Sequence, residues 1–304
     1  MSVSMSGTVL TRDLFTADGT LIASRGEIVD LPYLKDVAAR ACRGARERPL
    51  HETPLADAVL EAFEEPALTH LVGSDEARAC VADAICEVRF PQAVWDELEL
   101  LRREDAARYQ HAVWTALIAA RLFRAALGDA PGLSRLAGGA LVHDVGMRHT
   151  AARLSTKRDH LSRAEALALE DHPLIGALTL ASSLGDAPAV HFALLHHTRA
   201  GLGYPRVPGR PPLRGLDVVA LSSAFAALLA PRSYRLQSFS PRGAADQVLE
   251  EARAGHFDVR AVRLLIHCLR GARGAFADLL LPQSPTGFRP PRNHHGLAPA
   301  GAAA

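Results

Sequence analysis

The sequence predicts a mainly α-helical protein that is preceded by a small α/β module. Aromatic side chains make up only 5% of the 304 residues, and Ala, Leu and Val supply most of the apolar ones. A core rich in Ala and Leu suits closely packed helices, because both residues are strong helix formers. From residue 91 onwards, apolar residues recur at helical spacing between short connections marked by Gly and Pro. This recurrence of apolar residues at helical spacing predicts a helical bundle.

Residues 7 to 34 follow another pattern, in which apolar and polar side chains alternate. Turn signals stand at Asp18-Gly19 and at Arg25-Gly26. This combination predicts a short hairpin or meander with a tight turn at Asp18-Gly19. Helical patterns follow as far as Phe90-Pro91, where proline interrupts the chain. We therefore expect a small N-terminal module over residues 1–90, formed by a β-hairpin and then helices.

Residues 91–283 are expected to form the helical domain, which begins with the segment QAVWDELELLRRE. Ser162 followed by Glu165 is a capping-box pattern that opens one of its helices. The last residues, 284–304, are rich in Pro, Gly and Ala and are expected to be a disordered tail. The expected helices span Tyr109–Leu127, Leu133–Val145, Ser162–Leu184, Ala187–Arg199, Gly215–Leu229 and Asp258–Arg273.

Charge and composition argue against several classes of protein. The formal net charge of +1 gives no sign of a nucleic-acid-binding surface or of attraction to a membrane surface. No signal-peptide pattern opens the chain, and no apolar stretch reaches the roughly 20 residues that a membrane-spanning helix needs. The four cysteines form no CxxC pair, which favours reduced thiols. We expect a cytoplasmic protein that binds neither nucleic acid nor membrane.

Several histidines and one aspartate fall within apolar stretches of successive predicted helices. A buried polar group is costly unless it is satisfied, and one such histidine is more often a hydrogen-bonded core residue than a ligand. Six groups in successive helices favour a metal site instead, because imidazoles suit first-row metals and a carboxylate can bridge two ions. The groups are His111, His143, Asp144, His172, His196 and His197. The chemistry predicts divalent ions (iron, manganese or zinc), with one or two per chain.

The order and spacing of these residues resemble the HD-GYP family, the HD-superfamily phosphodiesterases that hydrolyse cyclic di-GMP. The resemblance covers roughly residues 105 to 270 and includes Gly203-Tyr204-Pro205, an RPYR-like segment at 232–235 and an FDP-like segment at Asp258. It implies an all-α domain with two adjacent metals. One would be held by Asp144, His172, His196 and His197, and the other by His111, His143, Asp144 and a final aspartate.

The resemblance also implies roles for further residues. Asp144 would be the catalytic group that bridges the metals and positions the attacking hydroxide. Arg232 and Arg235 would contact the phosphates of the dinucleotide, together with Tyr204 as a substrate-binding residue. A reading from the residues alone gives two solvated arginines that follow a helix. The implied ligand is cyclic di-GMP or a related nucleotide, signalling proteins are the expected partners, and the oligomeric state stays open.

The sequence departs from the family pattern at positions that bear on the chemistry. The final metal aspartate is Ser223, and Asp217 cannot replace it, because six residues place it on another helix face. Met147 stands where the HDxGK motif has lysine. The HHExxDGxGYP segment is one residue short and has Thr198 in place of its glutamate, and Ala226 replaces a second aspartate.

Three functions fit these observations. The first is a degenerate HD-GYP-like signalling module, with hydrolysis reduced or lost, that binds a nucleotide or a protein. The second is an active two-metal phosphodiesterase that cleaves cyclic di-GMP. The third is an HD-type phosphohydrolase that acts on another phosphoester. Departures concentrated at the chemistry favour the first, since each lost charge can cost a few kcal/mol of transition-state stabilisation.

Overall fold

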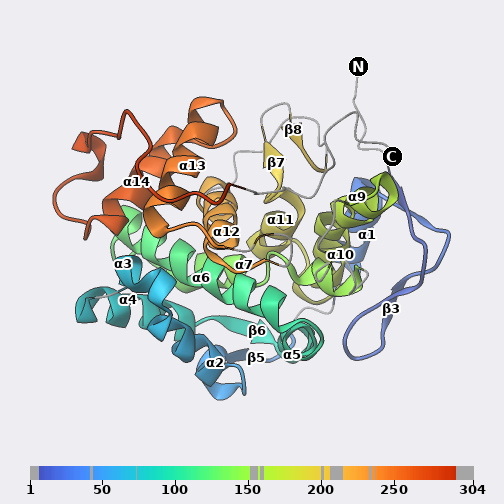
Figure 1. Cartoon of the computed structure of the whole chain (residues 1–304). Coiled ribbons are helices and arrows are strands. Elements are labelled where there is room, and N and C mark those ends of the chain that lie inside the picture. Colours follow the sequence, from blue (N-terminus) through green and yellow to red (C-terminus); the bar gives the residue numbers. More distant parts are fainter. Residues whose placement is uncertain are drawn as a thin grey trace.

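The computed structural model describes residues 7–41, 44–72, 74–150, 157, 161–199, 202–205, 215–232, 235 and 237–291. Helices make up most of this part of the chain, and the strands form short antiparallel pairs (Figure 1). The predicted mainly α fold with a small α/β module at its N-terminus is confirmed. No helix within the described ranges combines the length and the apolar character that a bilayer crossing requires.

Four short strands and one helix form the first part of the N-terminal module that was expected over residues 1–90. β2 pairs with β3 and β1 pairs with β4, both antiparallel. The predicted turn is present at Asp18-Gly19, where Gly19 has a φ of 84° and the amide of Thr16 donates to the carbonyl oxygen of Thr20 at 2.9 Å. The elements are β1 (Thr8–Val9), β2 (Leu14–Phe15), β3 (Leu21–Ala23), β4 (Ile28–Val29) and α1 (Leu31–Arg40).

The next segment links these strands and α1 to the helical part of the chain. Its two strands, β5 and β6, pair across the segment, with Arg48 opposite Phe90. Buried residues on both sides of residue 90 belong to one continuous hydrophobic core, so the division at that residue stays a prediction. The elements are β5 (Glu47–Pro49), η1 (Leu50–Glu52), α2 (Ala56–Glu61), η2 (Ala62–Glu64), η3 (Pro66–Leu68), α3 (Thr69–Val72), α4 (Asp75–Cys86) and β6 (Arg89–Pro91).

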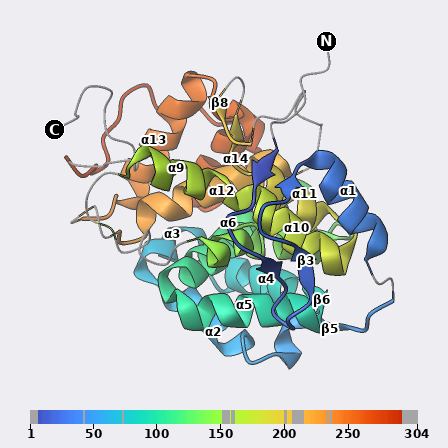
Figure 2. The same ribbon diagram turned by 90° about the vertical axis from the view of Figure 1, so that its right-hand side faces the viewer.

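The central helix of the remainder is α6 (Ala106–Leu127), whose middle is buried almost all round. It packs against α4, α5, α7, α12 and α14, while α1 and β3 pack on α10 (Figure 2). The other elements are α5 (Gln92–Glu104), α7 (Leu133–Leu141), η4 (Val145–His149), α9 (Arg163–Glu170), α10 (His172–Leu184), α11 (Pro188–Leu195), β7 (Thr198–Arg199), β8 (Leu202–Gly203), α12 (Leu216–Leu229), α13 (Pro241–Arg253), α14 (Val259–Leu269) and η5 (Phe276–Asp278).

The predicted single helix over Ser162–Leu184 is wrong, because the chain breaks it at Asp171. The predicted capping box is present between Ser162 and Glu165 and begins α9, which ends at Glu170. Pro173 cannot donate a helical hydrogen bond, and its ring clashes within a continuing helix. It is tolerated in the first turn of a new helix, and α10 accordingly begins one residue earlier, at His172.

The segment after η5 contacts α13. Asp246 on α13, itself a helix that the sequence analysis did not identify, accepts hydrogen bonds from the amides of Thr286 and Gly287 at 2.8 and 2.9 Å. The carbonyl oxygen of Phe288 accepts from the amide of Ser240 at 3.2 Å. Residues 286–288 are thus held against the start of α13, while the expected disorder of the tail stays a prediction. Residues 292–304 of the predicted tail lie outside the described residues.

A close contact between two glycines positions the segment that follows α7. A Cβ atom added to Gly146 would lie 2.1 Å from the carbonyl oxygen of His172 and 2.5 Å from the amide nitrogen of Gly176. A Cβ added to Gly176 would meet the amide nitrogen of Gly146 at 3.0 Å. Only glycine at position 146 therefore permits η4 and α10 to approach this closely.

We predict that Gly146→Ala destabilises the fold much more than Gly176→Ala does. The first change forces a methyl group into main-chain atoms and should lower the free energy of unfolding by about 3 kcal/mol or more. The second needs a shift of only a few tenths of an ångström, and alanine's higher helix propensity offsets part of its cost. Urea unfolding followed by circular dichroism measures both. Equal midpoints for Gly146→Ala and the unchanged protein would contradict the contact.

Candidate metal centre

The residues predicted to ligate metal come from four segments and meet in one buried place. α6 supplies His111, the chain after α7 supplies His143 and Asp144, and α10 begins with His172. His196 and His197 follow α11 directly. Their nitrogen and oxygen atoms fall into two groups that could each hold a metal ion, with all atoms of a group within 4.8 Å of one another. The groups are His172, His196 and His197, and His111, His143 and Asp144.

In the first group the main chain determines which ring nitrogen is free. His172 Nδ1 lies 2.6 Å from the carbonyl oxygen of Leu169, and His196 Nδ1 lies 2.8 Å from that of Ala193. A carbonyl oxygen only accepts, so both Nδ1 atoms carry the proton and both Nε2 atoms present lone pairs in the neutral rings. This arrangement is typical of metal-ligating histidines, whose second nitrogen is held by an outer hydrogen bond.

The free nitrogens of the first group converge on Asp144. His172 Nε2 lies 3.3 Å from His196 Nε2 and 3.1 Å from Asp144 Oδ1. Oδ1 is buried and has no aligned hydrogen-bond donor within the described structure. Two imidazole lone pairs and a carboxylate oxygen repel one another at such distances unless a cation lies between them. The donor set therefore fits a divalent metal ion, and His197 is close enough to complete it.

The second group is organised differently, around the hydroxyl of Ser223 on α12. Ser223 Oγ lies 3.3 Å from His111 Nε2 and 3.2 Å from His143 Nε2. His143 Nδ1 donates to the carbonyl oxygen of Ala140 at 2.7 Å, which leaves its Nε2 as an acceptor. Ser223 can donate to that nitrogen while its oxygen accepts from His111 Nε2–H. His111 Nδ1 is buried and has no partner among the described residues.

Burial sets the protonation of these side chains. Burial lowers the pKa of His143, and it holds the pKa values of His111, His196 and His197 well below the ordinary value of 6.5, assisted by nearby cationic groups. Burial alone would raise the pKa of Asp144, but the adjacent imidazole of His172, followed by those of His143 and His111, holds it well below 3.8. An ionised carboxylate among neutral imidazoles is the state that binds a metal ion.

A small hairpin holds the Gly-Tyr-Pro segment against this centre. Thr198 pairs with Gly203, and its Oγ1 donates to the carbonyl oxygen of Pro205 at 3.3 Å. Gly203 has a φ of 80°, and a Cβ there would lie 2.0 Å from the carbonyl oxygen of His197. The Tyr204 ring stacks on His197 at a centroid distance of 4.7 Å. Tyr204 therefore lies beside the candidate metal ligands, and Thr198 serves the hairpin.

The structure shows a structural role for Arg235. Its Nη2 donates to the carbonyl oxygens of Ala227, Leu228 and Ala230 at 2.6–2.9 Å, at the C-terminal end of α12. The side chain is buried and its guanidinium also lies 5.2 Å from the ring centre of Phe239. Free carbonyl groups at a helix end need donors, and Arg235 supplies them. Arg235 secures the helix that carries Ser223, and the phosphate contact expected for it stays a prediction.

Met147 and Ala226 are both buried apolar residues, on η4 and α12 respectively. Arg232 is half-buried and its charge acts on His111, lowering the pKa of that imidazole after the effect of burial. The Nε atom of Arg232 is buried and has no acceptor within the described structure. Arg232 is therefore placed to meet an anion near His111. Ser233 and Tyr234 lie outside the described residues.

Arg108 is a functional candidate that the sequence analysis missed. It precedes His111 by three residues on α6, so both side chains lie on one face of the helix. Its side chain is 12% exposed and pairs with Asp105 at 3.0 Å. Burial lowers the pKa of Arg108, while the carboxylates of Asp144 and Asp105 counter that effect and Arg232 adds to it. The helical spacing from His111 was the available signal.

Comparison with known proteins points to one group of enzymes. No family model matches the chain. It is 28% identical over 148 residues to 3'3'-cGAMP-specific phosphodiesterase 1 of Vibrio cholerae, covering 48% of this chain and 33% of that protein. It is 25% identical over 167 residues to cyclic di-GMP phosphodiesterase PdeB of Borreliella burgdorferi, covering 52% of this chain and 42% of that protein. The matches thus span less than half of either relative.

Both relatives are cyclic-dinucleotide phosphodiesterases by name, which agrees with the phosphodiesterase resemblance found in the sequence. Among solved structures, Bd1817, a HDG"Y"P protein from Bdellovibrio bacteriovorus, is 16% identical with a TM-score of 0.42, over 89% of this chain and 99% of that one. The family resemblance rests on the two sequence relatives. The histidines and the aspartate of the predicted centre form two groups in the structure, each with one ligand atom per residue and all of these atoms within 4.8 Å of one another.

We predict that acid destabilises the metal-free protein through its buried histidines. Their pKa values are lower in the folded chain, so the unfolded chain binds protons first as the pH falls below about 6.5. Between pH 6.5 and 4.5 the free energy of unfolding should fall by up to about 1.4 kcal/mol per pH unit for each such histidine. Urea unfolding in the presence of a chelator measures the slope.

Two variants test whether buried histidines cause this pH dependence of the free energy of unfolding. Burial lowers the pKa of His149 to about 3, so His149→Gln should remove one histidine's share. The exposed His51 provides the matched control, since His51→Gln should leave the slope unchanged. Equal free energies of unfolding at pH 6.5 and 4.5 would contradict the assignment.

Proposed function

We propose that this chain is an HD-GYP-like module that binds a cyclic dinucleotide at a centre holding one metal ion, with hydrolysis reduced or lost. Asp144, His172, His196 and His197 would hold the ion. A divalent ion there would act as a Lewis acid on a phosphodiester. The bound nucleotide, rather than its cleavage, would then carry the signal to a protein partner.

The observation that carries this proposal is the position of Ser223. Its hydroxyl lies between the Nε2 atoms of His111 and His143, within hydrogen-bonding distance of both. A neutral hydroxyl is a poor ligand, yet it satisfies the two nitrogens that a second ion would otherwise engage. His111 also lacks the outer hydrogen bond that orients His143, His172 and His196. The second group is therefore stable without an ion.

The charges beside this second group support an anionic ligand. Arg108 and Arg232 both lower the pKa of His111. Among the described residues, Arg108 forms an ion pair with Asp105 alone, and Arg232 forms none. Arginine suits phosphate because its planar donors can bind two oxygens at once. The two arginines would supply the positive charge that is missing at Met147, where the HDxGK motif has lysine. The names of the two relatives favour a cyclic dinucleotide such as cyclic di-GMP or cGAMP.

An active two-metal phosphodiesterase is the second candidate function. It is favoured by the survival of both ligand groups, each with its atoms within 4.8 Å of one another. Hydrolysis of another phosphoester is a third, and the Tyr204 ring stacked beside the metal ligands favours the cyclic-dinucleotide readings over it.

We predict one metal ion per chain, and two after Ser223→Asp. An aspartate would add a charged ligand where the serine hydroxyl now makes hydrogen bonds. Elemental analysis of the purified protein measures the content, and Ser223→Ala is the matched control that should stay at one ion. Hydrolysis of cyclic di-GMP and cGAMP should be slow or undetectable in the unchanged chain and should rise in Ser223→Asp combined with Met147→Lys. Two ions and rapid turnover in the unchanged chain would establish the active enzyme instead.

We predict that Arg108→Gln weakens cyclic dinucleotide binding by about tenfold or more. The change removes a charged donor next to the centre, and hydrogen bonds to charged groups contribute about 1.5–3 kcal/mol. Isothermal titration calorimetry with the metal-loaded protein measures the affinity. Arg102→Gln is the matched control, because Arg102 also pairs with an acidic residue three positions earlier but lies on α5. Equal weakening by both substitutions would show a general effect of charge.

A further inference from the structure

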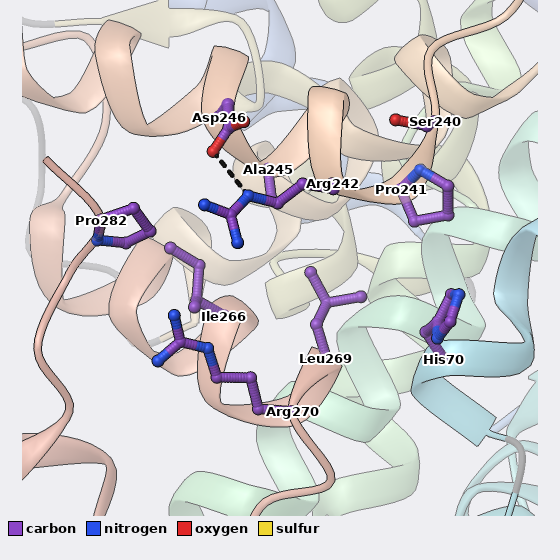
Figure 3. A pocket seen from close by; sticks show the side chains of 10 residues that line it. All are labelled: His70, Ser240, Pro241, Arg242, Ala245, Asp246, Ile266, Leu269, Arg270 and Pro282. Atoms are coloured by element: carbon purple, nitrogen blue, oxygen red, sulfur yellow. Dashed lines mark hydrogen bonds and ion pairs between the residues drawn. The ribbon is translucent and has the colours of Figure 1, made fainter. Parts of the chain in front are cut away.

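A cavity lies away from the histidine cluster, between α3, α13 and α14. It has a volume of about 310 Å³, and no residue of the candidate metal centre lines it. Ile266 and Leu269 of α14 and Ala245 of α13 give it an apolar wall, and Pro282 closes one side (Figure 3). This volume is at the lower end of the range for small-molecule sites, about 300–1,000 Å³.

Two arginines direct their guanidinium groups into the same part of this cavity. Arg242 comes from the first turn of α13, and Arg270 follows the last turn of α14 (Figure 3). Both lie close to Ile266 and Pro282, whereas His70 borders the cavity farther away (Figure 3). The cavity thus combines an apolar wall with a cationic end.

Arg242 is held in position by a buried carboxylate. Its Nε donates to Asp246 Oδ1 at 3.0 Å, and Asp246 is 3% exposed. The other oxygen, Oδ2, already accepts from the amides of Thr286 and Gly287. Asp246 thereby fixes the guanidinium through Nε, and neither terminal nitrogen of Arg242 has an acceptor among the described residues. A side chain fixed in this way loses little entropy when it binds a ligand.

The charges near the cavity do not balance. Arg270 makes no side-chain hydrogen bond or ion pair with any described residue, so two guanidinium groups face the single carboxylate of Asp246. An anion that enters the cavity would contact both arginines, and a carboxylate or phosphate matches the donor geometry of a guanidinium group. An apolar body attached to that anion would cover Ile266 and Leu269.

We propose that this cavity binds a small amphipathic anion, with its carboxylate or phosphate group between Arg242 and Arg270 and its apolar body against α14. A cyclic dinucleotide carries two phosphates and two large polar bases, so it fits neither the volume nor the apolar wall. The site is therefore distinct from the proposed nucleotide site. It adjoins that site through α12, which packs on α13 and α14 and carries Ser223.

Titration of the full chain with octanoate and with octyl phosphate tests the proposal by calorimetry. We expect saturable binding of one molecule per chain for at least one of them. Inorganic phosphate and 1-octanol, which each carry only half of the recognised chemistry, should bind at least about tenfold more weakly. Saturation by octanoate alone, or by octyl phosphate alone, would identify the anionic group that the arginines prefer.

Variants locate the bound molecule. Arg242→Gln and Arg270→Gln should each weaken binding by about tenfold or more, and Ala245→Leu should block it by filling the cavity. Arg273→Gln is the matched control, an exposed arginine three residues after Arg270. An unchanged metal content in every variant separates this site from the histidine centre. Absence of saturable binding, equal affinity for 1-octanol, or full affinity in the Arg242→Gln, Arg270→Gln double variant would overturn the proposal.

Discussion

The contact between Gly146 and Gly176 is the constraint on which the arrangement of the centre depends. It brings η4 so close to the start of α10 that any side chain at position 146 would overlap main-chain atoms of His172 and Gly176. Asp144 precedes this contact by two residues, and His172 lies within it. The short distance between Asp144 Oδ1 and His172 Nε2, 3.1 Å, therefore follows from main-chain packing, and the carboxylate does not have to be drawn into place by a ligand. Pro173 contributes by starting a new helix at His172, which directs that imidazole inwards from the first turn.

Outer hydrogen bonds explain why the two halves of the centre differ. His143, His172 and His196 each donate Nδ1–H to a main-chain carbonyl three residues earlier, so their geometry comes from local helix ends and needs no other side chain. His111 lies in the middle of α6, where the carbonyls are already used within the helix, and its Nδ1 has no described partner. Its orientation depends on Ser223, and Ser223 depends on α12, whose last carbonyls are bound by Arg235. Ser223 therefore links His111 and His143 to α12, because its hydroxyl lies within hydrogen-bonding distance of both imidazoles.

The sequence was sufficient to predict the mainly α fold, the N-terminal turn and the residues that gather in the centre, because periodicity and motif spacing are local properties. It was not sufficient for features that depend on tertiary packing. The break before His172 was missed although Pro173 signals it, because the apolar pattern continues across the break. The contacts of Arg235 with the C-terminal carbonyls of α12 could not be predicted either, because its motif does not show where that helix ends in space. Arg108 was not predicted as a site residue, because a single arginine on a helix is usually solvated. Only the folded structure shows that it is buried and close enough to Asp144 to interact with it. The contact of residues 286–287 with α13 comes from Asp246, whose interaction with two distant amides leaves no trace in composition.

The N-terminal module helps to hold the segments that carry the ligands. Glu97 on α5 is almost fully buried, accepts from the amide of Ala17 in the predicted turn, and pairs with Arg148 at 2.8 Å on η4. Burial raises the pKa of Glu97, and Arg148 offsets that effect only in part. Thr8 on β1 donates to Asp171 at 3.0 Å, next to His172. Removing either partner of the buried Glu97–Arg148 pair would cost about 3–5 kcal/mol, and deleting the strands would take away the Ala17 amide that Glu97 also binds. The geometry of the metal centre is thus a property of the chain from its first strand onwards, although all of its candidate ligands lie in the helical part.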